Sequence, residues 1–160
     1  MHSRTLLALA VPTLVLAACN PFSRGPVTEV SRDMNLNSRW TASLVTPAAL
    51  AGAVQMNGTA SMQPGPDANN TDFRLQVANA TPGGMHPWQV HRGQCGADAG
   101  VFGGADAYRA MKIGDDGRGE TGATIAERTP SGGEYYVVVY ASEANSGTVV
   151  ACGNLAPPAR

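Results

Sequence analysis

The chain has 160 residues, a net charge of −1 and 43% hydrophobic residues. It has no cluster of basic residues, so we expect no nucleic-acid partner. With its first residues set aside as a signal, about 140 residues remain, the length of one ordinary domain.

The first 19 residues have the pattern of an export signal. Arg4 stands in a short polar start, and the apolar run Leu6–Val15 follows it. That run is shorter than the roughly 20 residues that span a bilayer, so residues 1–18 are predicted to be a signal peptide. Residues 16–19, Leu-Ala-Ala-Cys, resemble a bacterial lipobox, in which the cysteine is alkylated by a diacylglyceryl group. Cys19 would then be the first mature residue; the alternative is an ordinary secretion signal with a chance cysteine.

A lipid on Cys19 makes the membrane a partner of the chain. The next residue is Asn20, whereas an aspartate there would resemble an inner-membrane retention signal. We therefore expect a lipid-anchored protein of the bacterial cell envelope, in the outer membrane and facing the periplasm. Residues 19–38 are polar, contain proline and glycine, and are predicted to be a flexible tether.

Two cysteines remain, Cys95 and Cys152. An exported compartment is oxidising, so the simplest prediction is a disulfide between them. Two free thiols are the alternative.

From Trp40 onward, short runs rich in Val, Thr and aromatic residues alternate with clusters of turn residues, which predicts an all-β domain over residues 39–155. Residues 156–160 are read as a C-terminal tail. Eight such strands imply a closed barrel or a two-sheet sandwich. The predicted strands are Trp40–Thr46, Ala53–Met62, Asp72–Ala78, His86–His91, Tyr108–Ile113, Glu120–Ala126, Tyr135–Ala141 and Thr148–Cys152.

Three blocks in order, "GGMHPWQVHRGQC", "VVVYAS" and "VVACGNL", resemble the copper/zinc superoxide dismutase superfamily. The likeness extends over roughly residues 40–155. It implies an eight-stranded Greek-key β-barrel, and it places Cys95 and Cys152 at the family's intrasubunit disulfide.

The same resemblance implies a degenerate metal site. The family holds a redox-active copper by several imidazoles, one of which bridges to zinc. In this chain Gln89 replaces the first histidine of the His-x-His pair, so only His91 remains there. Tyr140 stands at the late histidine position, Val149 stands where a cation would steer the substrate, and residues 95–108 contain no histidine. We therefore expect no dismutase catalysis and no resident cofactor, with copper as the alternative.

Two histidines of the first block have separate interpretations. By the resemblance, the ring of His86 is structural and bridges backbone groups. His91 is predicted to point out of the barrel on the same face as Gln89. It is either an exposed remnant of a metal face or part of a copper(I) site with Met85, Gln89 and Met111, since thioethers suit cuprous copper. Methionine in strand-like runs is otherwise core filler.

A stripe of large side chains lies nearby in the sequence. In "EYYVVVYAS", Val137 and Val139 are predicted to fill the barrel, which places Tyr136, Val138 and Tyr140 on its outer face. Either a loop covers this stripe or it contacts another protein of the periplasm or envelope. The predicted function is thus a non-catalytic binding or interaction module. The alternative is a copper-binding protein or a residual copper-only enzyme that uses His91.

Overall fold

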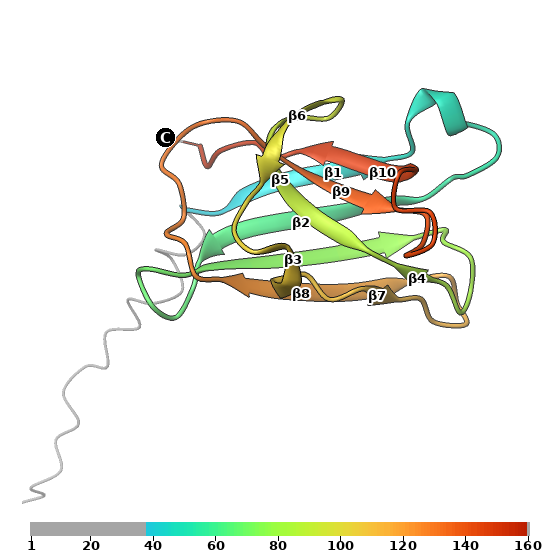
Figure 1. The fold of residues 1–160 in the computed structure, drawn as a ribbon, viewed down its shortest axis with the longest axis horizontal. Helices are drawn as coiled ribbons and strands as arrows, with labels where there is room; N and C mark the ends of the chain where they lie inside the picture. Colours follow the sequence, from blue (N-terminus) through green and yellow to red (C-terminus); the bar gives the residue numbers. More distant parts are fainter. Residues whose placement is uncertain (1–37, 160) are drawn as a thin grey trace, which may run out of the picture.

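The computed structural model describes residues 38–159 (Figure 1). The predicted signal peptide, the lipidation site Cys19 and the tether up to residue 37 lie outside the described residues. Within residues 38–159, no helix combines the length and the apolar character that crossing a membrane requires.

The described part of the chain is built almost entirely of antiparallel strands. Eight of them form one sheet in the order β6-β5-β9-β10-β1-β2-β3-β8, and β4 pairs separately with β7. The strands are β1 (Trp40–Val45), β2 (Asn57–Pro64), β3 (Thr71–Ala78), β4 (Met85–His86), β5 (Trp88–Gln94), β6 (Ala97–Val101), β7 (Met111–Lys112), β8 (Gly119–Ile125), β9 (Tyr135–Tyr140) and β10 (Val149–Asn154). Two 3-10 turns, η1 (Ala48–Leu50) and η2 (Ala105–Ala107), complete the elements.

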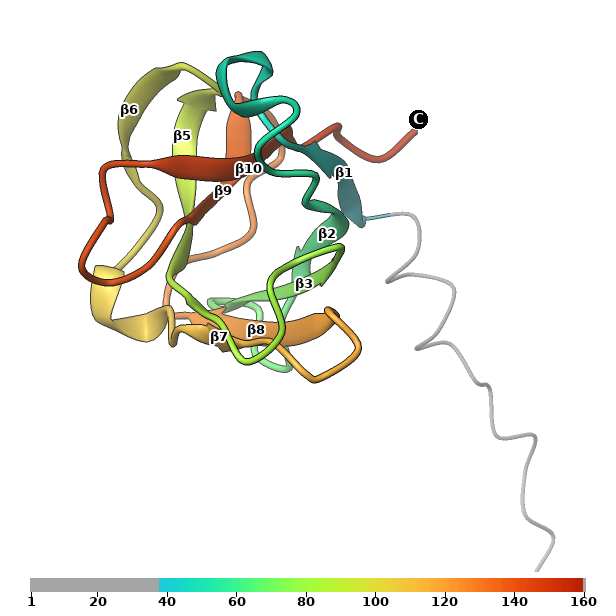
Figure 2. The same cartoon turned by 90° about the vertical axis from the view of Figure 1, so that its right-hand side faces the viewer.

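The large sheet curls around its interior into a half-barrel, and β7 lies against β8 at the open side (Figure 2). The all-β prediction is confirmed. Side chains alternate along the strands of this sheet: β1 buries Trp40, Ala42 and Leu44 and turns the residues between them outward. Period-2 patterning of this kind puts one face of a strand in the core.

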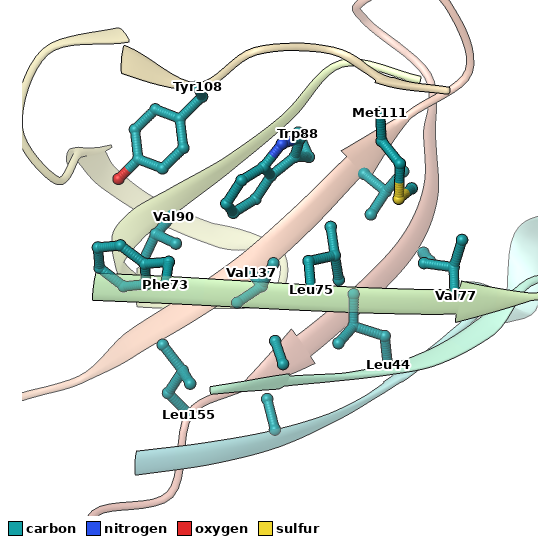
Figure 3. Close-up of a cluster of buried hydrophobic side chains, with 14 of the residues drawn as sticks. Leu44, Phe73, Leu75, Val77, Trp88, Val90, Tyr108, Met111, Val137 and Leu155 are labelled. Atoms are coloured by element: carbon teal, nitrogen blue, oxygen red, sulfur yellow. The ribbon is translucent and has the colours of Figure 1, made fainter. Parts of the chain in front are cut away.

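The core lies inside the curl, where side chains of all the long strands except β6 meet (Figure 3). The ring of Trp88 packs edge-on against Tyr108 at a centroid distance of 5.1 Å, and its indole N–H donates to the Arg109 carbonyl at 2.9 Å. Met111 is 1% exposed within this core. It is core filler, as the strand-like run around it suggested.

Two predicted strands begin three or four residues later in the structure. The strand predicted over Ala53–Met62 begins only at Asn57, because residues 51–54 form a turn. It continues to Pro64, whose partner on β3 is Thr71. The strand predicted over Tyr108–Ile113 shrinks to the two residues of β7.

The predicted strand His86–His91 is two strands. Pro87 separates them, since proline has no backbone N–H to donate to a ladder. β4 pairs with β7, whereas β5 pairs with β9 and β6.

β6 is not among the predicted strands. Its sequence, Ala-Asp-Ala-Gly-Val, has little side-chain pattern, and it pairs with β5 through the backbone. β6 forms one edge of the eight-stranded sheet.

Candidate functional site

A groove of about 790 Å³ lies on the outer side of the sheet, where β1, β10 and β9 meet the β5–β6 hairpin. The predicted stripe Tyr136, Val138 and Tyr140 lines it. Val45 and Val149, from β1 and β10, add apolar surface. β1 therefore joins β9 and β10, which are far from it in the sequence, in a single apolar lining.

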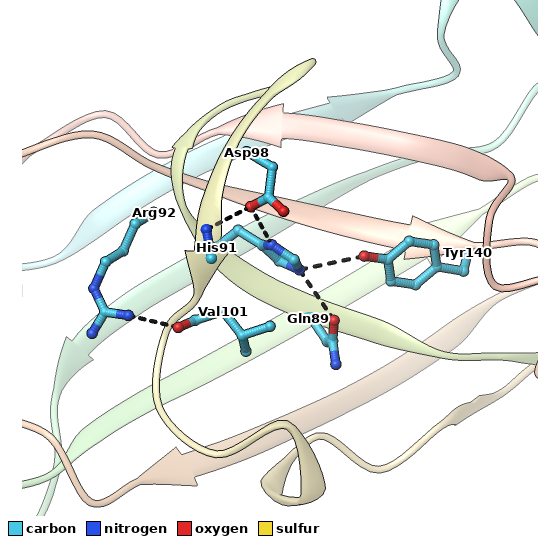
Figure 4. Close-up of polar contacts among 7 residues, drawn as sticks. Gln89, His91, Arg92, Asp98, Val101 and Tyr140 are labelled. Carbon is cyan, nitrogen blue, oxygen red and sulfur yellow. Dashed lines mark hydrogen bonds and ion pairs between the residues drawn. The ribbon is translucent and has the colours of Figure 1, made fainter.

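His91 lies at the wall of the groove and is hydrogen-bonded at both ring nitrogens (Figure 4). Its Nδ1 lies 2.7 Å from Oδ1 of Asp98. Its Nε2 lies 3.1 Å from Oε1 of Gln89 and 3.3 Å from the Tyr140 hydroxyl. His91 shares a face with Gln89 as predicted, but it is only 6% exposed. The expected exposed position is wrong because β6 folds over this face and brings Asp98 onto the ring.

The protonation of the ring follows from its partners. A carboxylate only accepts, so Nδ1 carries a proton and donates it to Asp98. If Nε2 is bare, the Tyr140 hydroxyl donates to it and the Gln89 amide presents its NH₂ group. If Nε2 is protonated, it donates to the Gln89 oxygen. In either case both ring nitrogens have hydrogen-bond partners, which hold the imidazole in one orientation.

Asp98 is the anionic centre of the site. The backbone N–H of Gly100 donates to its Oδ1 at 2.9 Å. This hydrogen bond, followed by those from His91 and from the Tyr136 hydroxyl, lowers the pKa of the carboxyl below its ordinary value. The side chain is 56% exposed, so an ionised carboxylate at the groove also faces solvent.

The two phenols of the groove remain neutral. Burial, with the nearby Asp98 carboxylate second, raises the pKa of Tyr136 to about 12. The same two causes raise the pKa of Tyr140. The Tyr136 ring also packs against the imidazole of His91 at a centroid distance of 5.3 Å. The groove therefore presents the partly exposed ring of Tyr140 without phenolate charge, while Tyr136 is only 6% exposed.

The predicted disulfide is confirmed. Cys95 and Cys152 are bonded, with their Cα atoms 6.0 Å apart, and both line the groove. The backbone N–H of Cys95 donates to Oδ1 of Asn154 at 2.8 Å. The disulfide thus ties the turn between β5 and β6 to β10, on the opposite side of the groove.

A second clamp holds β6 from its other end. Arg92 donates to the Val101 carbonyl at 2.6 Å and pairs with Glu127 at 2.8 Å. Its guanidinium lies 5.1 Å from the centroid of the Phe102 ring. Because this side chain is engaged there, its charge does not line the groove.

The residues proposed for copper are only partly brought together. His91 and Gln89 touch, whereas Met85 lies on β4, is 47% exposed and is not among the residues that line the groove. Met111 is in the core. In the part of the chain that the structure describes, no three His, Cys, Asp or Glu side chains gather as a metal-binding group. One imidazole, an amide and a phenol with a raised pKa do not fit a copper that cycles between oxidation states.

His86 has part of the predicted structural role. Its Nδ1 donates to the Tyr140 carbonyl at 2.9 Å, which links β4 to the end of β9. The ring is 8% exposed, and among the described residues its Nε2 has no hydrogen-bond partner. One of the two expected backbone contacts is therefore present.

Sequence reasoning did not assign a role to Asp98 or Val45. Asp98 carried a local signal, since an aspartate two residues before a glycine is common in turns. Val45 carried none, because its place depends on how β1 pairs with β10 at Cys152.

No family model matches the chain, and no curated protein matches it.

Proposed function

We propose that this chain is a lipid-anchored envelope protein whose superoxide dismutase-like Greek-key domain acts as a non-catalytic binding module. The three sequence blocks and the bonded cysteine pair support the family likeness. The curled antiparallel sheet is compatible with it. The lipobox-like segment ending at Cys19 supports export, anchoring in the outer membrane and a periplasmic orientation.

One observation carries the binding function: the face beside His91 is a mostly apolar groove instead of a cluster of imidazoles. Its volume of about 790 Å³ lies in the range of roughly 300–1,000 Å³ typical of ligand sites. Such sites combine an apolar lining with a few polar groups that fix orientation. Here the lining is valine and tyrosine, and the polar groups are Asp98 and the hydroxyls of Tyr136 and Tyr140.

The side chains around Nε2 of His91 are poorly suited to hold a catalytic copper. A redox copper needs several nitrogen donors that tolerate both oxidation states. The Nε2 of His91 faces an amide and a phenol. Burial favours the protonated phenol of Tyr140, and a protonated phenol is a poor ligand for copper. The proposed module therefore binds without turnover of superoxide.

The test removes the tyrosine side chains that line the groove. Tyr140→Ser, with Tyr136→Ser as a second variant, should change the co-purifying partners or the oligomeric state of the purified, disulfide-intact chain. Gln76→Ser is the matched control, since Gln76 is exposed on β3 and is not among the groove-lining residues. Circular dichroism verifies that each variant is folded. If folded tyrosine variants keep the partners and oligomeric state of the parent, the proposal loses its support.

A second candidate is a copper-binding protein. The favouring observation is the carboxylate on Nδ1 of His91, because metal-ligating histidines usually donate their other N–H to such a group. Metal analysis after incubation with copper separates the two functions. Stoichiometric copper that His91→Ala abolishes would support this candidate, and a metal-free chain would support the binding module.

A further inference from the structure

The charges around the groove are unequal. The only acidic side chain among the described residues that line it is Asp98, and these residues include no lysine or arginine. Arg92, next to His91 in the chain, is held by Glu127 and the Val101 carbonyl. A ligand in the groove therefore meets a carboxylate and no fixed cation.

The aromatic surface of the groove favours the same kind of ligand. Tyr140 presents a partly exposed, neutral ring, whereas Tyr136 is only 6% exposed and packs against His91. The face of a neutral ring attracts a cation within about 6 Å of its centroid. The nearby carboxylate of Asp98 attracts an ammonium group as well. An anion at the same place would meet the Asp98 charge and no partner of opposite sign.

The apolar part of the lining adds a second requirement. Val45 and Val149 come from the neighbouring strands β1 and β10, whereas Val138 on β9 is 2% exposed and offers almost no surface. Val45 is 62% exposed, so it offers surface that a bound apolar group would cover. A small inorganic cation would leave this surface in contact with water, whereas an organic body would bury it.

We propose that the groove binds an organic cation, an ammonium or guanidinium group on an apolar body, with the charge beside Asp98 and the body over the valines. This inference rests on the proposed binding function and names the ligand class of the same groove. It predicts preference for a cation over a neutral or anionic molecule of the same shape.

The probes are benzyltrimethylammonium, benzyl alcohol and phenylacetate, titrated into the purified, disulfide-intact chain and followed by calorimetry and by NMR shift changes. Benzyltrimethylammonium is expected to bind most tightly of the three and to shift the amide signals of Val138, Tyr140 and Val149. Tyr140→Leu should weaken it about two- to five-fold, through loss of one ring face.

The decisive experiment places opposite charges at one exposed position of the groove. Val45→Glu should tighten benzyltrimethylammonium, and Val45→Lys should weaken it, each by about two- to five-fold at low salt and less at high salt. The same pair at Gln76, which does not line this groove, should leave the affinity unchanged. Val45 is 62% exposed, so neither charged side chain has to be buried, and circular dichroism verifies that both variants are folded.

Three results would overturn the inference: equal or tighter binding of phenylacetate, equal effects of the two Val45 charges, or no saturable binding of benzyltrimethylammonium. Tight binding of benzyl alcohol or phenylacetate in the groove would reject the cation and still leave the binding function supported. Failure of the binding function itself would instead appear as unchanged partners in the tyrosine variants.

Discussion

The Nδ1–H group of His91 on β5 donates a hydrogen bond to Oδ1 of Asp98 on β6 at 2.7 Å. This contact joins the imidazole at the groove wall to the edge strand of the sheet. β6 pairs with β5 alone, so side chains contribute much of what holds it in place. Measurements of stability can test this arrangement, its charge state and the disulfide that anchors it.

The Asp98 contact predicts a loss of stability in acid. The pKa of Asp98 is lowered below its ordinary value of 3.8, so folding favours the ionised form. Its contribution is present above the unfolded-state pKa and is lost as the pH falls through the lower, folded-state pKa. Urea unfolding at a series of pH values should show the free energy of unfolding falling below about pH 4.

Asp98→Asn should make that acid dependence shallower, because the amide has no proton to gain. Asp115→Asn, at an exposed position in the turn before β8, should keep the parent's dependence. An Asp98→Asn profile as steep as the parent's would contradict the assigned role of the carboxylate.

The buried phenols predict a loss of stability in alkali. Tyr136 has a pKa raised to about 12 from an ordinary 10.0, so folding favours its neutral form. This contribution is complete below the unfolded-state pKa near 10 and is lost as the pH rises through about 12. Tyr140 acts in the same direction. Tyrosinate absorbance should therefore rise late, together with the loss of the native circular dichroism signal.

Tyr136→Phe removes one of these groups and should reduce the alkaline loss. Ionisation of all four tyrosines near the ordinary pKa, in a chain that remains native, would show that these phenols are not shielded.

Removing the disulfide should destabilise the fold substantially. Cys95 and Cys152 are 57 residues apart, and in the chain-entropy model closing such a loop stabilises by about 4 kcal/mol. We expect the double variant Cys95→Ser/Cys152→Ser to lose about 3–4 kcal/mol in urea unfolding. The reduced parent should behave in the same way. A parent that is equally stable in reductant and oxidant would refute this prediction.

Gly93→Ala should weaken the β5–β6 hairpin. Gly93 has a φ of 100°, and a Cβ at this position would collide with the Ala97 carbonyl. Positive φ and a backbone collision together should cost about 1–3 kcal/mol of unfolding free energy. Gly132→Ala is the matched control, because a Cβ there meets nothing within 4 Å. Equal stability of the two variants would indicate that the hairpin tolerates a different turn.

Much of the fold was predictable because strand patterning is local. The strands Trp40–Thr46 and Asp72–Ala78 were predicted within one residue of β1 and β3, since their residue types mark them locally. The inward position of Val137 and Val139 followed from period-2 alternation. Pairing of Cys95 with Cys152 was predictable from their number and the expected oxidising compartment.

Other features depended on contacts between distant residues. β6 has small residues without a hydrophobic period, so only backbone pairing with β5 makes it a strand. The burial of His91, and with it the place of Asp98, depended on that strand.

By itself, then, the sequence determined an all-β chain, the inward side chains Val137 and Val139 and its cysteine pair, because these follow from residue type and spacing. The tertiary structure alone decided that Val45, Asp98 and Tyr140 share one groove. That neighbourhood arises from the order in which the curled sheet pairs its strands, and no local pattern of residues encodes that order.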